Sequence, residues 1–143
     1  MNRDIIKVLI GKVILEIRVM SFFINRNLVC EIIVFYVKTS DLKWYKFTTS
    51  DGVNVVEFLP DEPQLTSLDS INDDFAYPIK SIQNNYINCQ IFNIKEYMWQ
   101  GKKDESNGFY FEFEDNKNFS LFEDDGCLII IDGIWFDENF SLY

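Results

Sequence analysis

Apolar and polar residues alternate with a period of two along much of this chain. In residues 13–19, VILEIRV, the side chains of Val13, Leu15, Ile17 and Val19 fall on one face, and two charged side chains fall on the other. This spacing is typical of a β-strand with one buried side. The pattern therefore predicts a strand near the N-terminus of the chain.

Residues 13–59 repeat this strand pattern, interrupted by short turn sequences. The run LVCEIIVFYVK is apolar on both faces, and two further strand-like runs follow it. Asp51 and Gly52 form a dipeptide that favours a two-residue hairpin. We therefore predict a four-stranded antiparallel meander over 13–59. Residues 1–12 remain ambiguous between a strand and a short helix capped by Asp4.

Residues 60–78 break the pattern, because they are polar, contain three prolines and show no period. We predict a long connection here, with one helical turn near 67–71, and such connections are uncommon unless they serve a function or lie over a sheet. Residues 79–143 then resume strand-like runs and form a second predicted meander. The expected fold is one mainly β domain over 1–143: a sandwich or a partly open barrel with at most one or two short helices.

The segment GFYFEFEDNKNFSLFEDDG carries the clearest alternation in the second half. Phe109, Phe111 and Phe113 share one face of its first strand, and Tyr110 and Glu112 lie on the other. Phenylalanines in the core with carboxylates outward is the expected arrangement of a one-sided sheet. We therefore expect the carboxylates of this region to gather on the solvent side.

Negative charge is concentrated in the last 40 residues. Residues 1–103 contain 12 acidic and 12 basic residues, whereas residues 104–143 contain 11 acidic residues and one basic residue, Lys117. That segment therefore holds the entire net charge of −10. Such a distribution favours a basic partner and argues against nucleic acid, whose binding depends on Lys and Arg contacts to phosphates. The alternative is an acidic surface that serves only solubility.

The absence of histidine excludes several chemistries. Ser-His-Asp and Cys-His catalysis and His-ligated metals all need an imidazole, and the chain has none. No calcium-loop, phosphate-loop or dinucleotide motif is present, so we expect no metal and no cofactor. Glu112 and Glu114 leave an acid–base enzyme formally open, but exposed carboxylates lack the burial that tunes a catalytic pKa. We therefore predict that the chain is not an enzyme.

The cysteine usage and the N-terminal segment both favour a cytoplasmic protein. Cys30, Cys89 and Cys127 lie far apart in apolar runs, and we expect them to be free thiols in a reducing compartment. Charged residues such as Lys7 and Lys12 interrupt the apolar N-terminal run, whereas a membrane-spanning helix needs about 20 nearly uncharged residues. We expect no association with a membrane.

A small, acidic, histidine-free β-domain of this kind resembles the immunity proteins of bacterial toxin–immunity systems, including those of contact-dependent growth inhibition. The resemblance is one of overall character and is strongest in FYFEFEDNKNFSLFEDDG. It implies a stoichiometric inhibitor that binds the catalytic domain of a cognate toxin, often a basic nuclease.

The resemblance and the charge distribution together give a candidate partner-binding surface. Carboxylates would speed up the encounter with a basic toxin, and an aromatic residue would anchor the complex. The candidate residues are Tyr110, Glu112, Glu114, Asp115, Glu123, Asp124 and Asp125.

A second hypothesis is a small-ligand-binding or accessory β-domain without catalytic activity. Its ligand would enter an aromatic cavity, or the 60–78 connection would act as a lid. The aromatic residues considered for such a cavity are Trp44, Tyr45, Tyr97, Trp99, Trp135 and Phe136.

Overall fold

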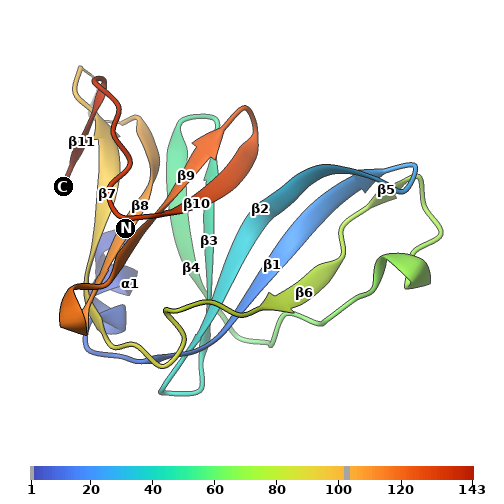
Figure 1. Ribbon diagram of the computed structural model, residues 1–143, viewed down its shortest axis with the longest axis horizontal. Helices are drawn as coiled ribbons and strands as arrows, with labels where there is room; N and C mark the ends of the chain where they lie inside the picture. The colour runs from blue at the N-terminus through green and yellow to red at the C-terminus, as the bar shows by residue number, and fades with distance from the viewer. Residues whose placement is uncertain (1, 102–103) are drawn as a thin grey trace.

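The computed structural model describes residues 2–101 and 104–143, which form two antiparallel β-sheets packed face to face (Figure 1). The predicted mainly β fold with short helices is confirmed, and the arrangement is a sandwich without a closed barrel. Residues Asn2–Leu9 form helix α1, so the ambiguous N-terminal segment is helical, with Asp4 in the first turn of the helix and not at its cap. Within the described ranges, no helix has the length and apolar character needed to cross a membrane.

The first sheet has the strand order β4-β3-β2-β1-β5, and β6 also pairs with β1. Its strands are β1 (Ile14–Ile24), β2 (Asn27–Thr39), β3 (Trp44–Ser50), β4 (Val53–Leu59), β5 (Phe75–Ala76) and β6 (Ile79–Ile82). Strands β1 to β4 pair in sequence order, as expected for a meander. Asp51 and Gly52 both have positive φ, of 53° and 75°, and connect β3 to β4 as the hairpin predicted from this dipeptide.

The connection after β4 belongs structurally to the first sheet. It contains the 3₁₀ turn η1 (Leu68–Ser70), capped by Ser67, where a helical turn was predicted. Strand β6, which the sequence pattern assigned to the second meander, pairs with residues 17–20 of β1. The chain therefore passes to the second sheet after residue 82 rather than at residue 79, because four residues of alternation do not reveal which sheet they join.

The second sheet has the strand order β10-β9-β8-β7-β11. Its strands are β7 (Ile91–Trp99), β8 (Ser106–Phe113), β9 (Asn118–Asp124), β10 (Cys127–Asp132) and β11 (Phe140–Leu142). The short 3₁₀ turn η2 (Glu114–Asn116) joins β8 to β9. In Figure 1 this sheet lies on the left, while β1 and β2 extend to the right beyond it.

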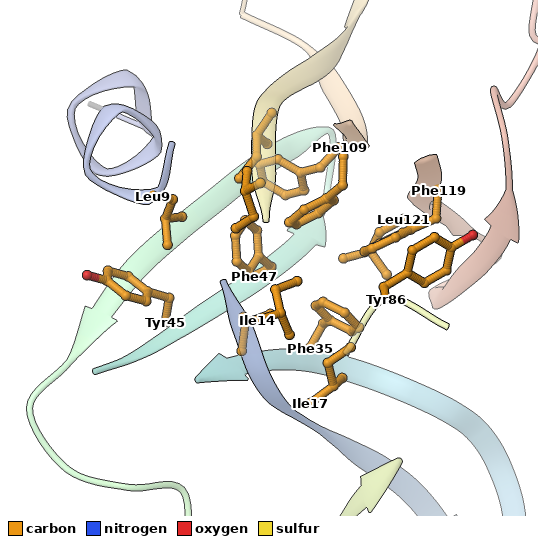
Figure 2. Packing of buried hydrophobic residues seen from close by; sticks show 14 of the residues in the cluster. Leu9, Ile14, Ile17, Phe35, Tyr45, Phe47, Tyr86, Phe109, Phe119 and Leu121 are labelled. Atoms are coloured by element: carbon orange, nitrogen blue, oxygen red, sulfur yellow. The ribbon is translucent and has the colours of Figure 1, made fainter. Parts of the chain in front are cut away.

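Phenylalanines from both sheets form the centre of the core. Phe35 and Phe47 of the first sheet make edge-on ring contacts with Phe111 and Phe109 of the second, with centroid separations of 6.3 and 5.1 Å. Figure 2 shows how these rings and the aliphatic side chains around them fill the space between the sheets. The inward orientation expected for Phe109, Phe111 and Phe113 is confirmed, since all are buried.

Tyr86 closes one end of the core from the segment between β6 and β7 (Figure 2). Its ring stacks on Phe113 and lies tilted against Phe119, and its hydroxyl lies within hydrogen-bond distance of two acceptors, the Asn118 carbonyl at 2.9 Å and the Asp132 carboxylate. Burial and the bonded, negatively charged Asp132 raise the pKa of Tyr86. The hydroxyl is thus a permanent donor that ties this segment to the second sheet.

Two expectations from the sequence are wrong. Leu15 is 37% exposed while Ile14 is fully buried, because the β1–β2 register shifts between Ile14 and Glu16 and moves the alternation by one residue. Cys30 and Cys127 are not free thiols but form a disulfide between β2 and β10. Their separation of 97 residues hides this pairing in the sequence.

Candidate interaction surface on the second sheet

The outer face of the second sheet is crossed by residues 133–139, which we call the strap. Strands β10 and β11 lie on opposite edges of the sheet, so the segment that joins them must cross it. The main-chain N–H of Trp135 donates to the Tyr97 hydroxyl and to Ser120 Oγ, at 2.9 and 3.1 Å. The Trp135 ring stacks on Phe122, with the ring centroids 4.5 Å apart. These contacts with β7 and β9 fix the strap against the face opposite the core.

The burial of Tyr110 limits the part that this residue can play in binding a partner. Tyr110 lies opposite Ser120 in the β8–β9 ladder and is only 7% exposed. Burial, together with the neighbouring Glu112 and Tyr97, raises its pKa. A side chain this buried offers little surface to a partner, so the structure places the predicted aromatic anchor inside the molecule.

Three of the predicted carboxylates gather at the η2 end of the second sheet. Glu112 and Lys95 are an ion pair across β7 and β8, with Nζ and Oε1 3.3 Å apart. Glu114 and Asp115 are exposed on the η2 turn. All three line a hollow of about 240 Å³ together with Lys117.

The other three predicted carboxylates lie at the opposite end of the same hairpin. Asp124 and Asp125 are exposed at the β9–β10 turn, and Glu123 Oε1 accepts a hydrogen bond from the Gly126 N–H at 3.0 Å. The seven residues of β9 separate the two ends by about 20 Å, at roughly 3.3 Å per residue. The structure therefore forms two carboxylate groups and does not bring all six together.

A groove opens between the strap and β11, with a volume of about 460 Å³. Phe136 of the strap is 91% exposed, and Ile134 is 55% exposed. Aromatic, carboxylate, amide, hydroxyl and aliphatic side chains form its walls. They are Tyr97, Gln100, Ile134, Trp135, Phe136, Asp137, Glu138, Phe140, Ser141 and Leu142.

Sequence reasoning missed the strap as an exposed apolar element. Tyr97, Trp135 and Phe136 were considered as lining of a ligand cavity, and the structure brings these three together in the groove. Trp44 and Tyr45 lie elsewhere, in β3 of the first sheet. The usable signal was the run IWFDE, in which two apolar residues flank a tryptophan directly before two carboxylates.

A second exposed aromatic cluster lies where β1 and β2 extend beyond the second sheet. The Phe22 ring stacks on Phe75 and on Tyr77, with centroids 6.2 and 5.0 Å apart, and the latter two are about half exposed. Phe22 is the direct β-ladder partner of Cys30. The Cys30–Cys127 disulfide therefore connects this cluster to the carboxylate turn at Asp124 and Asp125.

Comparison with known proteins identifies no relative: no family model, no curated protein and no solved structure matches the chain. Within the described residues, no group of three or more Cys, Asp or Glu side chains is arranged to hold a metal ion.

Proposed function

We propose that this chain is an immunity-type inhibitor that binds a basic toxin domain, such as a nuclease, through the acidic second sheet. The proposal combines the resemblance in character to immunity proteins with the charge of residues 104–143. It needs no cofactor and no catalytic residue, because the inhibitor acts by occupying the partner's surface. Binding is stoichiometric.

The observation that carries the proposal is the excess of exposed carboxylates that form no ion pair. Glu114 and Asp115 at one end of the second sheet, and Asp124 and Asp125 at the other, are exposed. Among the described residues, none of these four has a Lys or Arg within 4.0 Å. A one-signed field of this kind raises the rate at which an oppositely charged protein arrives.

The inhibitory step follows from the chemistry of a nuclease. A nuclease domain holds its substrate's phosphates with Lys and Arg side chains. An acidic protein that docks on those side chains competes with the nucleic acid for the same charges. The two carboxylate ends of the second sheet would contact a basic surface at two places about 20 Å apart, the length of β9 at roughly 3.3 Å per residue.

We place this function in the cytoplasm, where a nuclease toxin meets its substrate. The Cys30–Cys127 disulfide bears directly on this assignment, because cytoplasmic thiols are normally kept reduced. The proposal therefore requires that the reduced chain keeps the sandwich fold and still binds. That requirement can be measured on the purified protein.

The test uses the product of the gene encoded next to that of this chain. We expect the two proteins to co-purify in a 1:1 complex, and we expect the complex to lack the toxic activity of the free partner. A variant with Glu114→Lys and Asp124→Lys should protect cells less well, whereas the charge-matched control Asp61→Lys with Asp73→Lys should protect them like the wild type. A neighbouring product that is not toxic, or that remains fully active with a saturating amount of this chain, contradicts the proposal.

A second candidate function is binding of a small ligand, which the groove beside the strap favours. Its volume of about 460 Å³ lies within the range of roughly 300–1,000 Å³ typical of small-molecule sites. A thermal-shift screen separates the two candidates. Stabilisation by a metabolite favours the ligand-binding function, and stabilisation only by a protein favours the inhibitor.

A further inference from the structure

The groove between the strap and β11 combines aromatic walls with negative charge. The Trp135 ring contacts the Tyr97 ring edge-on, with the ring centroids 5.2 Å apart. It also contacts the Phe140 ring, with an interplanar angle of 41° and the centroids 5.4 Å apart. Phe136 stands almost fully exposed at the same groove. Rings at several angles around one space can present π-faces to a bound group, which is the arrangement that attracts cations.

Two carboxylates complete this environment. Asp137 and Glu138 both line the groove, and none of the described residues that line it is Lys or Arg. Asp137 Oδ1 accepts a hydrogen bond from the Asn139 N–H at 2.8 Å, which orients this carboxylate. A cation entering the groove would meet unpaired negative charge, whereas a phosphate or a carboxylate would be repelled.

The groove is held in place before any partner arrives. Ser120 Oγ donates to the Gly133 carbonyl at 2.7 Å and accepts from the Tyr97 hydroxyl at 2.6 Å. Together with the Trp135 N–H bonds, these contacts fix the start of the strap to β7 and β9. A pre-organised site loses less conformational entropy on binding than a mobile loop.

We infer that this groove binds the guanidinium or ammonium side chain of an Arg or Lys residue projecting from a basic protein partner. The aliphatic stem of such a side chain can lie along Ile134 and Leu142 while its charged head meets Asp137 and Glu138. A neutral apolar group would instead bury these carboxylates without a counter-charge, which is unfavourable. The identity of the partner as a protein rests on the proposed function.

A neighbouring cavity serves as an internal contrast. It has a volume of about 420 Å³ and is lined by Arg3, Glu96, Met98, Trp99, Gln100 and Tyr143. Arg3 and Glu96 lie 3.7 Å apart there, so a carboxylate already has a cationic neighbour. We expect an added cation to prefer the groove at Trp135 over this cavity.

The experiment titrates the protein with N-acetyl-arginine methylamide and follows the indole N–H signals of the tryptophans by NMR. The neutral control is N-acetyl-citrulline methylamide, which has nearly the same shape. We expect the Trp135 signal to shift with millimolar affinity for the arginine compound and binding to citrulline to be about tenfold weaker, as expected from the loss of cation–π and charge contacts. Equal binding of both compounds, or a shift confined to Trp99, would overturn the inference.

Two double variants test the role of the carboxylates. Asp137→Asn with Glu138→Gln should weaken arginine binding about fivefold, since the variant removes two modest charge contacts at an exposed site. Asp61→Asn with Asp73→Asn removes the same charge at exposed positions of the connection after β4 and should leave binding unchanged. Backbone signals of β8 report whether each variant stays folded. An equal loss in both variants would show general electrostatics and refute a specific site.

The same variants separate this inference from the proposed function. If the neighbouring gene product does not bind but the arginine compound does, the proposed function fails and the cation groove stands. If the complex forms and Asp137→Asn with Glu138→Gln leaves its affinity unchanged, the inhibitor stands and the groove is not its docking site. Binding of free amines such as putrescine more tightly than the arginine compound would point to a metabolite and contradict a protein side chain.

Discussion

The side chain of Asn54 binds both backbone polar groups of Gly108. Its Nδ2 donates to the Gly108 carbonyl at 2.7 Å, and its Oδ1 accepts from the Gly108 N–H at 2.6 Å. Asn54 belongs to β4 of the first sheet and Gly108 to β8 of the second. The same Nδ2 also donates to the Glu96 carboxylate in β7, and the main-chain carbonyl of Asn54 accepts a hydrogen bond from Asn2 Nδ2 of α1. The Asn54 amide therefore joins the two sheets, and the main chain of the same residue holds the helix.

Replacing Asn54 by Ala should destabilise the protein strongly. The variant leaves the N–H and carbonyl of Gly108 buried without their partner, and each such group costs about 1–3 kcal/mol. We expect the free energy of unfolding in urea to fall by about 3 kcal/mol or more. Asn72→Ala, at an exposed position, is the control and should lie within about 0.5 kcal/mol of the wild type. Similar values for both variants would mean that the amide does not join the sheets.

Gly108→Ala, within strand β8, should be more damaging than a Gly→Ala change in a turn of this sheet. A Cβ at Gly108 would lie 2.2 Å from the Leu121 carbonyl oxygen, and its φ of +120° is unfavourable for alanine. Gly126, with φ of +86°, has no atom within 4 Å of such a Cβ. Gly126→Ala therefore measures the cost of placing alanine at a positive φ without any steric clash. We expect Gly126→Ala to fold with a loss of about 1–2 kcal/mol.

The measurement for this pair is soluble expression followed by chemical denaturation. Gly108→Ala should not yield folded protein, or should lose more than about 4 kcal/mol, a size seen only for severe packing or strain effects. Equal stability of Gly108→Ala and Gly126→Ala would show that β8 and β9 can separate without cost.

Replacing Cys30 and Cys127 by Ser should lower stability only under oxidising conditions. A cross-link between residues 97 apart lowers the conformational entropy of the unfolded chain. In the chain-entropy model this stabilises the folded state by about 4–5 kcal/mol. In urea without reductant, the free energy of unfolding should therefore be higher for the wild type than for the double variant. With dithiothreitol, the two values should be equal. Cys89→Ser, at the remaining free cysteine, controls for loss of a thiol. A reduced wild type that unfolds would contradict a cytoplasmic site of action.

Glu16 should make the first sheet sensitive to acid. Partial burial alone would raise its pKa, but hydrogen bonds from Arg18 and Ser81 and the charges of Arg18 and Lys38 outweigh this and hold the pKa below its ordinary value of 4.5. A carboxylate with a depressed folded-state pKa stabilises the fold fully above its unfolded value and loses this contribution as the pH falls through the folded value.

Urea denaturation between pH 2 and pH 6 tests this dependence. The wild type should lose stability below about pH 4.5 more steeply than Glu16→Gln, whose pH profile should be flatter in that range. Asp61→Asn, an exposed position without an ion pair among the described residues, should follow the wild type. Parallel profiles for wild type and Glu16→Gln would show that this carboxylate makes no difference to acid stability.

Alternation predicted the strands and the core because burial on one face leaves a period of two in the sequence. Phe109, Phe111 and Phe113 follow that rule and are all buried. The pattern cannot show what covers the other face, and the strap, which bonds to Tyr97 and Ser120 there, is a non-periodic segment that crosses the sheet. For the same reason the carboxylates at Glu114 and Asp124 were expected to gather on one face, although they lie at opposite ends of one hairpin.

Contacts between residues far apart in the sequence likewise could not be predicted from local patterns. Neither the Cys30–Cys127 disulfide nor the bonds of Asn54 to Gly108, 54 residues apart, leave a local trace. The charge distribution was readable, since it depends only on composition along the chain. Its location on the second sheet follows once β7 to β11 are known.

If carboxylates of the second sheet draw in a basic protein, the rate of association with that protein must depend on salt concentration. The rate should be measured by stopped flow with the neighbouring gene product, for wild type, for Glu114→Lys with Asp124→Lys, and for the charge-matched control Asp61→Lys with Asp73→Lys. We predict that the wild-type rate falls steeply from 20 to about 500 mM salt, as expected for steered association. The second-sheet variant should start at least about tenfold lower and depend little on salt, while the control stays close to wild type. Equal rates for both variants, or a wild-type rate independent of salt, would show that these carboxylates do not steer the partner.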